Sequence, residues 1–119
     1  MEKIKSFEEA CKALGIEPNV PDFSNSPVEH QKALSAHYKL VIIAQALNEG
    51  WKANFDDHNE WKYYPWFVKQ PGVGFSDLVC GRSDANAHVG SRLCYKSREL
   101  ARYAGETFKE LYNEYYLYS

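Results

Sequence analysis

The sequence has 119 residues, which is the usual size of one domain, and we expect a single domain over residues 1–119. Hydrophobic residues make up 45 % and charged residues 25 %, and 14 Lys and Arg against 16 Asp and Glu give a formal net charge of −2. This composition is typical of a soluble globular protein and excludes the collagen, coiled-coil and disordered classes. No apolar run approaches the roughly 20 residues of a membrane helix, so we expect a cytoplasmic protein without membrane contact.

The three cysteines, Cys11, Cys80 and Cys94, contain no C-x-x-C pair and cannot all be bridged within one chain. This spacing favours neither a disulfide framework nor a cysteine-rich zinc site. We therefore expect reduced, partly buried thiols, and we expect no metal or other cofactor.

Two helices are predicted in the N-terminal half. Ser6 and Glu9 have the spacing of a capping box, and Gly15 supplies a stop, which indicates a short first helix. The run Ser26–Glu29 combines a capping Ser, a first-turn Pro and a reciprocal Glu, and no helix breaker follows before Gly50. These features predict a second helix of about 22 residues, whose second half is apolar on nearly every side and should be central to the core.

The C-terminal half is predicted to hold strands and one helix. A strand begins near Glu60, and Pro65 places this strand at a sheet edge or at a bulge. The predicted fold class is α+β, with two N-terminal helices, a three-stranded antiparallel meander and a C-terminal helix packed on the sheet. The other two strands are expected over 75–80 and 92–96, a loop over 81–90, and the helix from Ser97 onward.

The segment Val89–Gly105, read as VGSRLCYKSRELARYAG, resembles the C-terminal part of small uncharacterised proteins that prophages and mobile elements of intestinal anaerobic bacteria carry. Those proteins also have an aromatic strand and a Gly-Phe turn, similar to Trp61–Phe67 and Gly74-Phe75 here, so the resemblance covers roughly residues 60–118. Where they have Phe and a Lys-Gln pair, this chain has Tyr95 and Glu106-Thr107. The resemblance implies a phage-like context and no mechanism.

The candidate metal ligands have plainer structural interpretations. His30 and His37 share a helix face but lie about 10.5 Å apart along the axis, too far for one metal ion. The run Asp56–Glu60 offers oxygen ligands and one imidazole for a divalent cation. It lacks the alternating spacing and the glycine of a calcium loop, so a solvated turn is the favoured interpretation.

Two arrangements for nucleophilic catalysis are also weak. Ser83, Asp84 and His88 lie within one loop, but catalytic triads usually draw their members from separate elements, and no nucleophile elbow surrounds Ser83. Cys94 with His88 is the rival pair, yet Cys94 lies inside a predicted strand, where a structural thiol is favoured. We name no catalytic residue, and we expect an interaction protein rather than an enzyme.

Aromatic side chains dominate the candidate binding surface. Alternation along Trp61–Phe67 places aromatic rings on both faces of the strand, and four tyrosines over 112–118 exceed what one core-facing stripe buries. These features predict a non-enzymatic interaction or assembly module, a homo-oligomer or a protein with a protein partner. The alternative is a single-stranded nucleic-acid binder that combines the sheet aromatics with the basic segment Arg82–Arg102, and a small hydrolase is a minor alternative. The predicted binding residues are Tyr64, Trp66, Arg82, His88, Arg92, Lys96 and Arg98.

Overall fold

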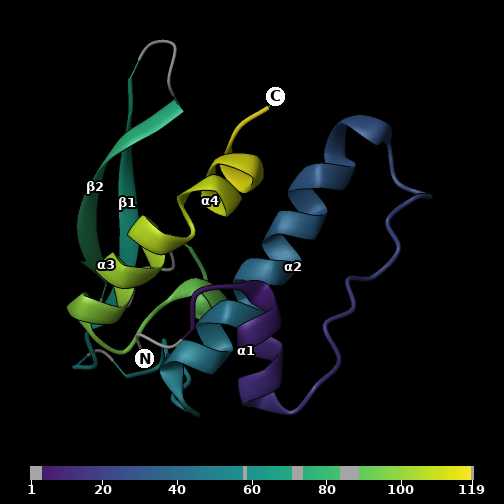
Figure 1. Ribbon diagram of the computed structural model, residues 1–119. Helices are drawn as coiled ribbons and strands as arrows, with labels where there is room; N and C mark the ends of the chain where they lie inside the picture. Colours follow the sequence, from purple (N-terminus) through teal and green to yellow (C-terminus); the bar gives the residue numbers. More distant parts are fainter. Residues whose placement is uncertain (1–3, 58, 71–73, 84–88, 119) are drawn as a thin grey trace.

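The longest helix, α2 (Val28–Asn48), runs through the centre of the molecule in the computed structural model (Figure 1). The structure describes residues 4–57, 59–70, 74–83 and 89–118, and of 68–70 and 74–83 it describes the backbone only. As predicted, the second half of α2 is the buried half, with Leu40, Ile43 and Leu47 at most 1 % exposed. The predicted Ser26 cap is wrong: Pro27 occupies the N-cap position, and the Ser26 hydroxyl donates to the Phe23 carbonyl at 2.7 Å.

Helix α1 (Phe7–Leu14) has the predicted bounds. The Ser6 hydroxyl accepts a hydrogen bond from the Glu9 amide at 3.1 Å, and Gly15 ends the helix in the left-handed conformation with φ 72°. The side chain of Glu9 reaches back to the amide of Lys5 at 2.6 Å. Phe7 packs edge to face on Tyr38 with ring centroids 6.1 Å apart, which fixes α1 against α2.

The sheet is a hairpin of two antiparallel strands, β1 (Lys62–Gln70) and β2 (Gly74–Ser83), which runs along the side of the molecule (Figure 1). Pro65 lies inside β1, opposite Cys80, and the irregularity in register falls between Val68 and Lys69. β1 forms one further bridge, at Tyr63.

The predicted fold, with its three-stranded meander, is wrong, because the described residues form a helix-dominated fold whose sheet has two strands. Residues 92–96, predicted as the third strand, instead include the end of the short 3₁₀ helix η1 (Ser91–Leu93). They also form a single bridge between Tyr95 and Tyr63, with N···O distances of 2.7 and 3.1 Å. The opposite backbone edge is taken by the side chain of Asn48, which accepts from the Lys96 amide at 3.0 Å and donates to the Cys94 carbonyl at 2.9 Å. Because a side chain rather than a strand occupies this edge, the β-ladder cannot continue beyond the bridge at Tyr95.

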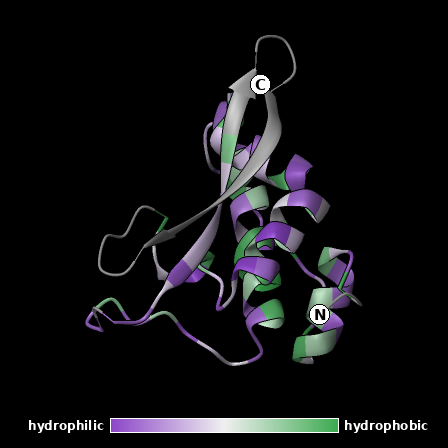
Figure 2. Ribbon diagram, turned by 90° about the vertical axis from the view of Figure 1, so that its left-hand side faces the viewer, coloured by the Kyte–Doolittle hydropathy of each residue, from purple (hydrophilic) through white to green (hydrophobic). Residues whose placement is uncertain are grey.

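The predicted C-terminal helix is also divided in two. Ser97 caps α3 (Arg98–Thr107) by accepting from the Leu100 amide at 3.1 Å, and α4 (Lys109–Tyr116) follows after a turn at Phe108 with φ −112° and ψ 30°. α3 packs on the hairpin and α4 packs on α2, as Figure 1 shows. α1 and α3 each turn one apolar face toward the core that they share with the buried half of α2, and Figure 2 shows hydrophobic and hydrophilic residues alternating along the helices.

Candidate functional site

The aromatic strand is less exposed than its sequence indicates. Trp66 is 52 % exposed, but Tyr64 is only 4 % exposed, so Tyr64 is wrongly predicted as an accessible binding residue. Burial, and then the nearby Cys94 thiol, raise the pKa of Tyr64. Phe67, from the other face of β1, packs on Tyr112 of α4 with ring centroids 5.1 Å apart. Of these three rings, Trp66 is therefore the most accessible to a partner, and Trp61, just before β1, is 48 % exposed as well.

The basic residues predicted to bind with this strand lie in different places. The ammonium of Lys96 pairs with Glu49 at 3.2 Å, and the guanidinium of Arg98 lies 5.7 Å from the ring centre of Tyr63. Arg92 lines a separate hollow at the end of α2. The side chain of Arg82 and the whole of His88 lie outside the described residues. Among the residues that the structure describes, Arg98 therefore lies against an aromatic ring of β1, whereas Lys96 pairs with Glu49 and Arg92 lines another hollow.

The acidic turn before β1 does hold a cation, and the cation is the ammonium of Lys62. Its Nζ donates to the carbonyl oxygens of Asp57 at 2.9 Å and Glu60 at 3.0 Å, lies 3.4 Å from the Glu60 carboxylate, and sits 5.1 Å from the ring centre of Phe55. The Lys62 side chain is fully buried. The described residues of 56–60 therefore form a turn whose carbonyl oxygens bind the Lys62 ammonium. His58 lies outside the described residues.

The thiol of Cys94 is buried and protonated at neutral pH. Its Sγ donates to the Gly90 carbonyl at 3.3 Å, and burial raises the pKa of the thiol to about 11, an effect that the charge of Lys62 partly opposes. A thiol in this state is a poor nucleophile. The rival triad, Ser83 with Asp84 and His88, falls on residues whose side chains the structure does not describe.

A groove lies between the beginning of α2 and the end of α4, and we call it the Tyr118 groove. Its volume is about 220 Å³. Tyr118 is 82 % exposed and Tyr116 is 39 % exposed. Partial burial of the Tyr116 side chain raises its pKa to about 12. The groove is lined by Glu29, His30, Lys32, Ala33 and residues 114–118.

Both histidines of α2 have aromatic partners from the α4 end of the chain. His37 stacks on Tyr115 with ring centroids 4.7 Å apart and an interplanar angle of 11°, and His30 lies 6.0 Å from the Tyr118 ring. The structural interpretation of these histidines agrees with these contacts. In the described part of the chain, no three His, Cys, Asp or Glu side chains are grouped so that they could hold a metal ion.

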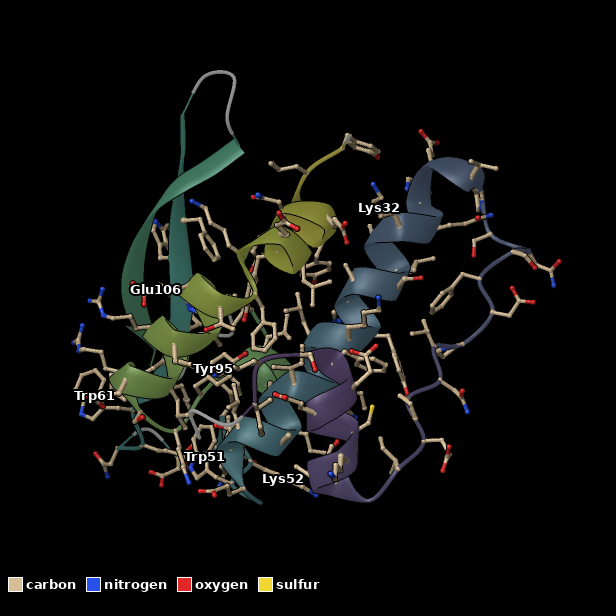
Figure 3. The ribbon with its side chains drawn as sticks, in the orientation of Figure 1. Lys32, Trp51, Lys52, Trp61, Tyr95 and Glu106 are labelled. Atoms are coloured by element: carbon tan, nitrogen blue, oxygen red, sulfur yellow. The ribbon has the colours of Figure 1, made fainter. Side chains whose placement is uncertain are left out.

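A second hollow, which we call the Trp51 pocket, lies at the opposite end of α2 and has a volume of about 380 Å³. Sequence analysis missed it because its residues come from three segments, of which the prediction singled out Arg92 alone. Its lining consists of Val41, Gln45, Asn48, Trp51, Lys52, Ala53, Ser91 and Arg92. Figure 3 labels Trp51 and Lys52 near the lower end of the molecule, far from Lys32 at the other end of α2.

The part of the chain that the structure describes contains no helix with both the length and the hydropathy needed to cross a membrane. Comparisons with protein families, with curated proteins and with solved structures found no match to this chain.

Proposed function

We propose that the chain is a non-enzymatic interaction module that associates with a second copy of itself through the Tyr118 groove. The observation that carries this proposal is the exposure of Tyr118, which lines the groove and is 82 % exposed; Val28, the residue before the groove residue Glu29, is 84 % exposed. Tyrosine is enriched in protein interfaces because it combines a large apolar ring with a hydroxyl that stays hydrogen-bonded.

The charges around the groove favour a second copy as the partner. Glu29 and Glu114 lie beside Lys32, so the lining carries both signs of charge. A two-fold contact through this groove allows Lys32 of one copy to pair with Glu29 or Glu114 of the other. The formal net charge of −2 is small, so repulsion between copies is weak.

A cytoplasmic location and a phage-like origin belong to the same proposal. Cys11 and Cys94 are free, buried thiols, which agrees with a reducing compartment. The phage-like origin rests on the sequence resemblance alone.

The test is light scattering on the purified chain over a wide range of concentrations. We expect a dimer of the 13.7 kDa chain, and we expect Tyr118→Ser to shift the equilibrium toward monomer by about tenfold or more in Kd. Ile16→Ser is the matched control, because Ile16 is an exposed apolar residue of the loop before α2 and should leave the equilibrium unchanged.

A monomer at every concentration would overturn the proposal. Loss of association in Trp66→Ser, with Tyr118→Ser unaffected, would also overturn it and would place the interface on the hairpin instead.

A further inference from the structure

The Trp51 pocket is formed by a sharp reversal of the chain at the end of α2. Glu49 and Gly50 both have positive φ, 51° and 94°, and the Trp51 amide donates back to the Asn48 carbonyl at 3.0 Å. The reversal brings Trp51 and Lys52 back beside the last turns of the helix. Glycine adopts such a conformation without strain, which explains its place in this turn.

The other wall of the pocket is η1, which carries Ser91 and Arg92. The side chain of Asn48 holds this wall in place, since it bonds both the Cys94 carbonyl and the Lys96 amide immediately after η1. The pocket is therefore bounded by three segments whose relative positions are fixed by hydrogen bonds of Asn48.

Several donors of the pocket are not engaged by the protein. The indole of Trp51, the ammonium of Lys52, the amide of Gln45 and the guanidinium of Arg92 make no hydrogen bond or ion pair with the residues that the structure describes. None of the eight lining residues is acidic. Two unpaired cations beside an aromatic ring favour a ligand that is both planar and negatively charged.

The helix itself accounts for only part of this arrangement. The C-terminal end of α2 carries a partial negative charge, which favours nearby Lys and Arg side chains. The charge at the helix end explains why Lys52 and Arg92 lie near it. It does not explain why Trp51 and a hollow lie between these two cations.

We propose that the Trp51 pocket binds one nucleotide, with the base stacked on the Trp51 ring and the phosphate held by Lys52 and Arg92. Aromatic side chains stack on any base, and the guanidinium fork matches phosphate oxygens. The volume of about 380 Å³ is near the lower limit for small-molecule sites, which suits a single nucleotide rather than a dinucleotide. The nucleotide is either free in solution or part of a single strand.

This site does not depend on the proposed self-association. The Tyr118 groove uses residues 29–33 of α2 and the Trp51 pocket uses residues 41–48, and the centres of these two stretches lie about 20 Å apart along the helix. Either proposal can therefore fail without the other.

The experiment is a titration of the full chain with adenosine monophosphate, followed by the indole N–H resonances of its three tryptophans in ¹H–¹⁵N NMR spectra. Trp51→Phe assigns the Trp51 resonance and retains a stacking ring, whereas Trp51→Leu removes the ring. We expect the Trp51 resonance to shift on titration while those of Trp61 and Trp66 stay in place.

Lys52→Ala and Arg92→Ala should each weaken binding by about tenfold, and Trp51→Leu should weaken it more than Trp51→Phe. Lys12→Ala, which removes an exposed cation from α1, is the matched control and should bind as the original chain does. Higher salt should also weaken binding.

A five-nucleotide single strand, titrated in parallel, distinguishes the two sources of the ligand. Tighter binding of the strand assigns the site to a nucleic acid, and equal or weaker binding assigns it to a free nucleotide. The absence of a Trp51 shift with both ligands at low salt would overturn the proposal, as would equal losses of affinity in Lys12→Ala and Arg92→Ala.

Discussion

The side-chain amide of Asn48 brackets Tyr95, bonding the carbonyl on one side of it and the amide on the other, at 2.9 and 3.0 Å. The backbone of Tyr95 itself faces the opposite way and pairs with Tyr63. Asn48 is only 5 % exposed, so water cannot readily replace either bond. One side chain of α2 thus completes the pairing of a segment that lies 46 to 48 residues further along the chain.

We predict that Asn48→Ala lowers the free energy of unfolding by about 2–4 kcal/mol, because it removes two hydrogen bonds and leaves buried backbone groups without partners. Urea unfolding followed by circular dichroism measures this change. Gln45→Ala, on the exposed side of the same helix, is the control and should stay within about 0.5 kcal/mol of the original chain. An equally small effect of Asn48→Ala would contradict the prediction.

The hydroxyls of Tyr95 and Tyr112 form a buried pair at 3.0 Å. Tyr112→Phe leaves the Tyr95 hydroxyl without this partner, and we expect a loss of roughly 1–3 kcal/mol in the free energy of unfolding. The double variant Tyr95→Phe/Tyr112→Phe should lose less than the sum of the two single variants, because no hydroxyl is then stranded. A double-mutant cycle by urea unfolding tests this, and strict additivity would show that the pair is not coupled.

Stability should fall in alkaline solution. The pKa of Cys94 is about 11 in the folded chain against an ordinary value of 9.0, so between these values the unfolded state releases a proton that the folded state keeps. This contribution is complete below pH 9.0 and is lost as the pH rises to about 11, by roughly 2–3 kcal/mol. Burial raises the pKa values of Tyr95 and Tyr112 as well, and their contributions are lost at still higher pH.

The check on this pH dependence is Cys94→Ala, which removes the thiol and keeps the tyrosines. Urea midpoints measured at neutral pH and through the alkaline window should fall less steeply for this variant. Identical slopes for the two proteins would assign the alkaline loss to other groups.

Two lysines with carboxylate partners should respond very differently to the same substitution. Lys62→Met removes a fully buried ammonium and leaves the carbonyls of Asp57 and Glu60 unsatisfied, so we expect a loss of about 3–5 kcal/mol. Lys96→Met removes an ammonium that pairs with Glu49 at the surface, so we expect a loss under about 1 kcal/mol. Thermal melts of both variants provide the comparison, and similar shifts would refute the distinction.

The features that were predicted correctly from the sequence are those with local causes. Ser6 and Gly15 cap α1 through bonds to residues a few positions away, and α1 and α2 have the expected extents. The third strand was predicted incorrectly because its pairing is decided by Asn48, a residue in a different element. The pattern of apolar and polar residues around Tyr95 does not predict a contact with Asn48.

The binding residues follow the same rule. Trp66 is exposed as predicted, but Tyr64 is buried by tertiary packing that alternation along one strand does not reveal. The Trp51 pocket joins residues about 40 positions apart, and its single local signal is Glu49-Gly50, a left-handed turn that folds Trp51 back onto α2. Such a turn predicts the reversal of the chain, although it does not predict that Arg92 will lie opposite.

The bracketing of Tyr95 has a consequence for hydrogen exchange. The amide of Tyr95 donates to Tyr63 at 2.7 Å and that of Lys96 to Asn48 at 3.0 Å, although neither residue belongs to a helix or a continuous strand. Opening either bond means separating the hairpin or α2 from the rest of the core, so we expect these two amides to exchange only through global unfolding. In native-state exchange experiments their protection should match that of the Ile43 amide in the buried half of α2, and markedly faster exchange would mean that the hairpin detaches while the helices stay folded.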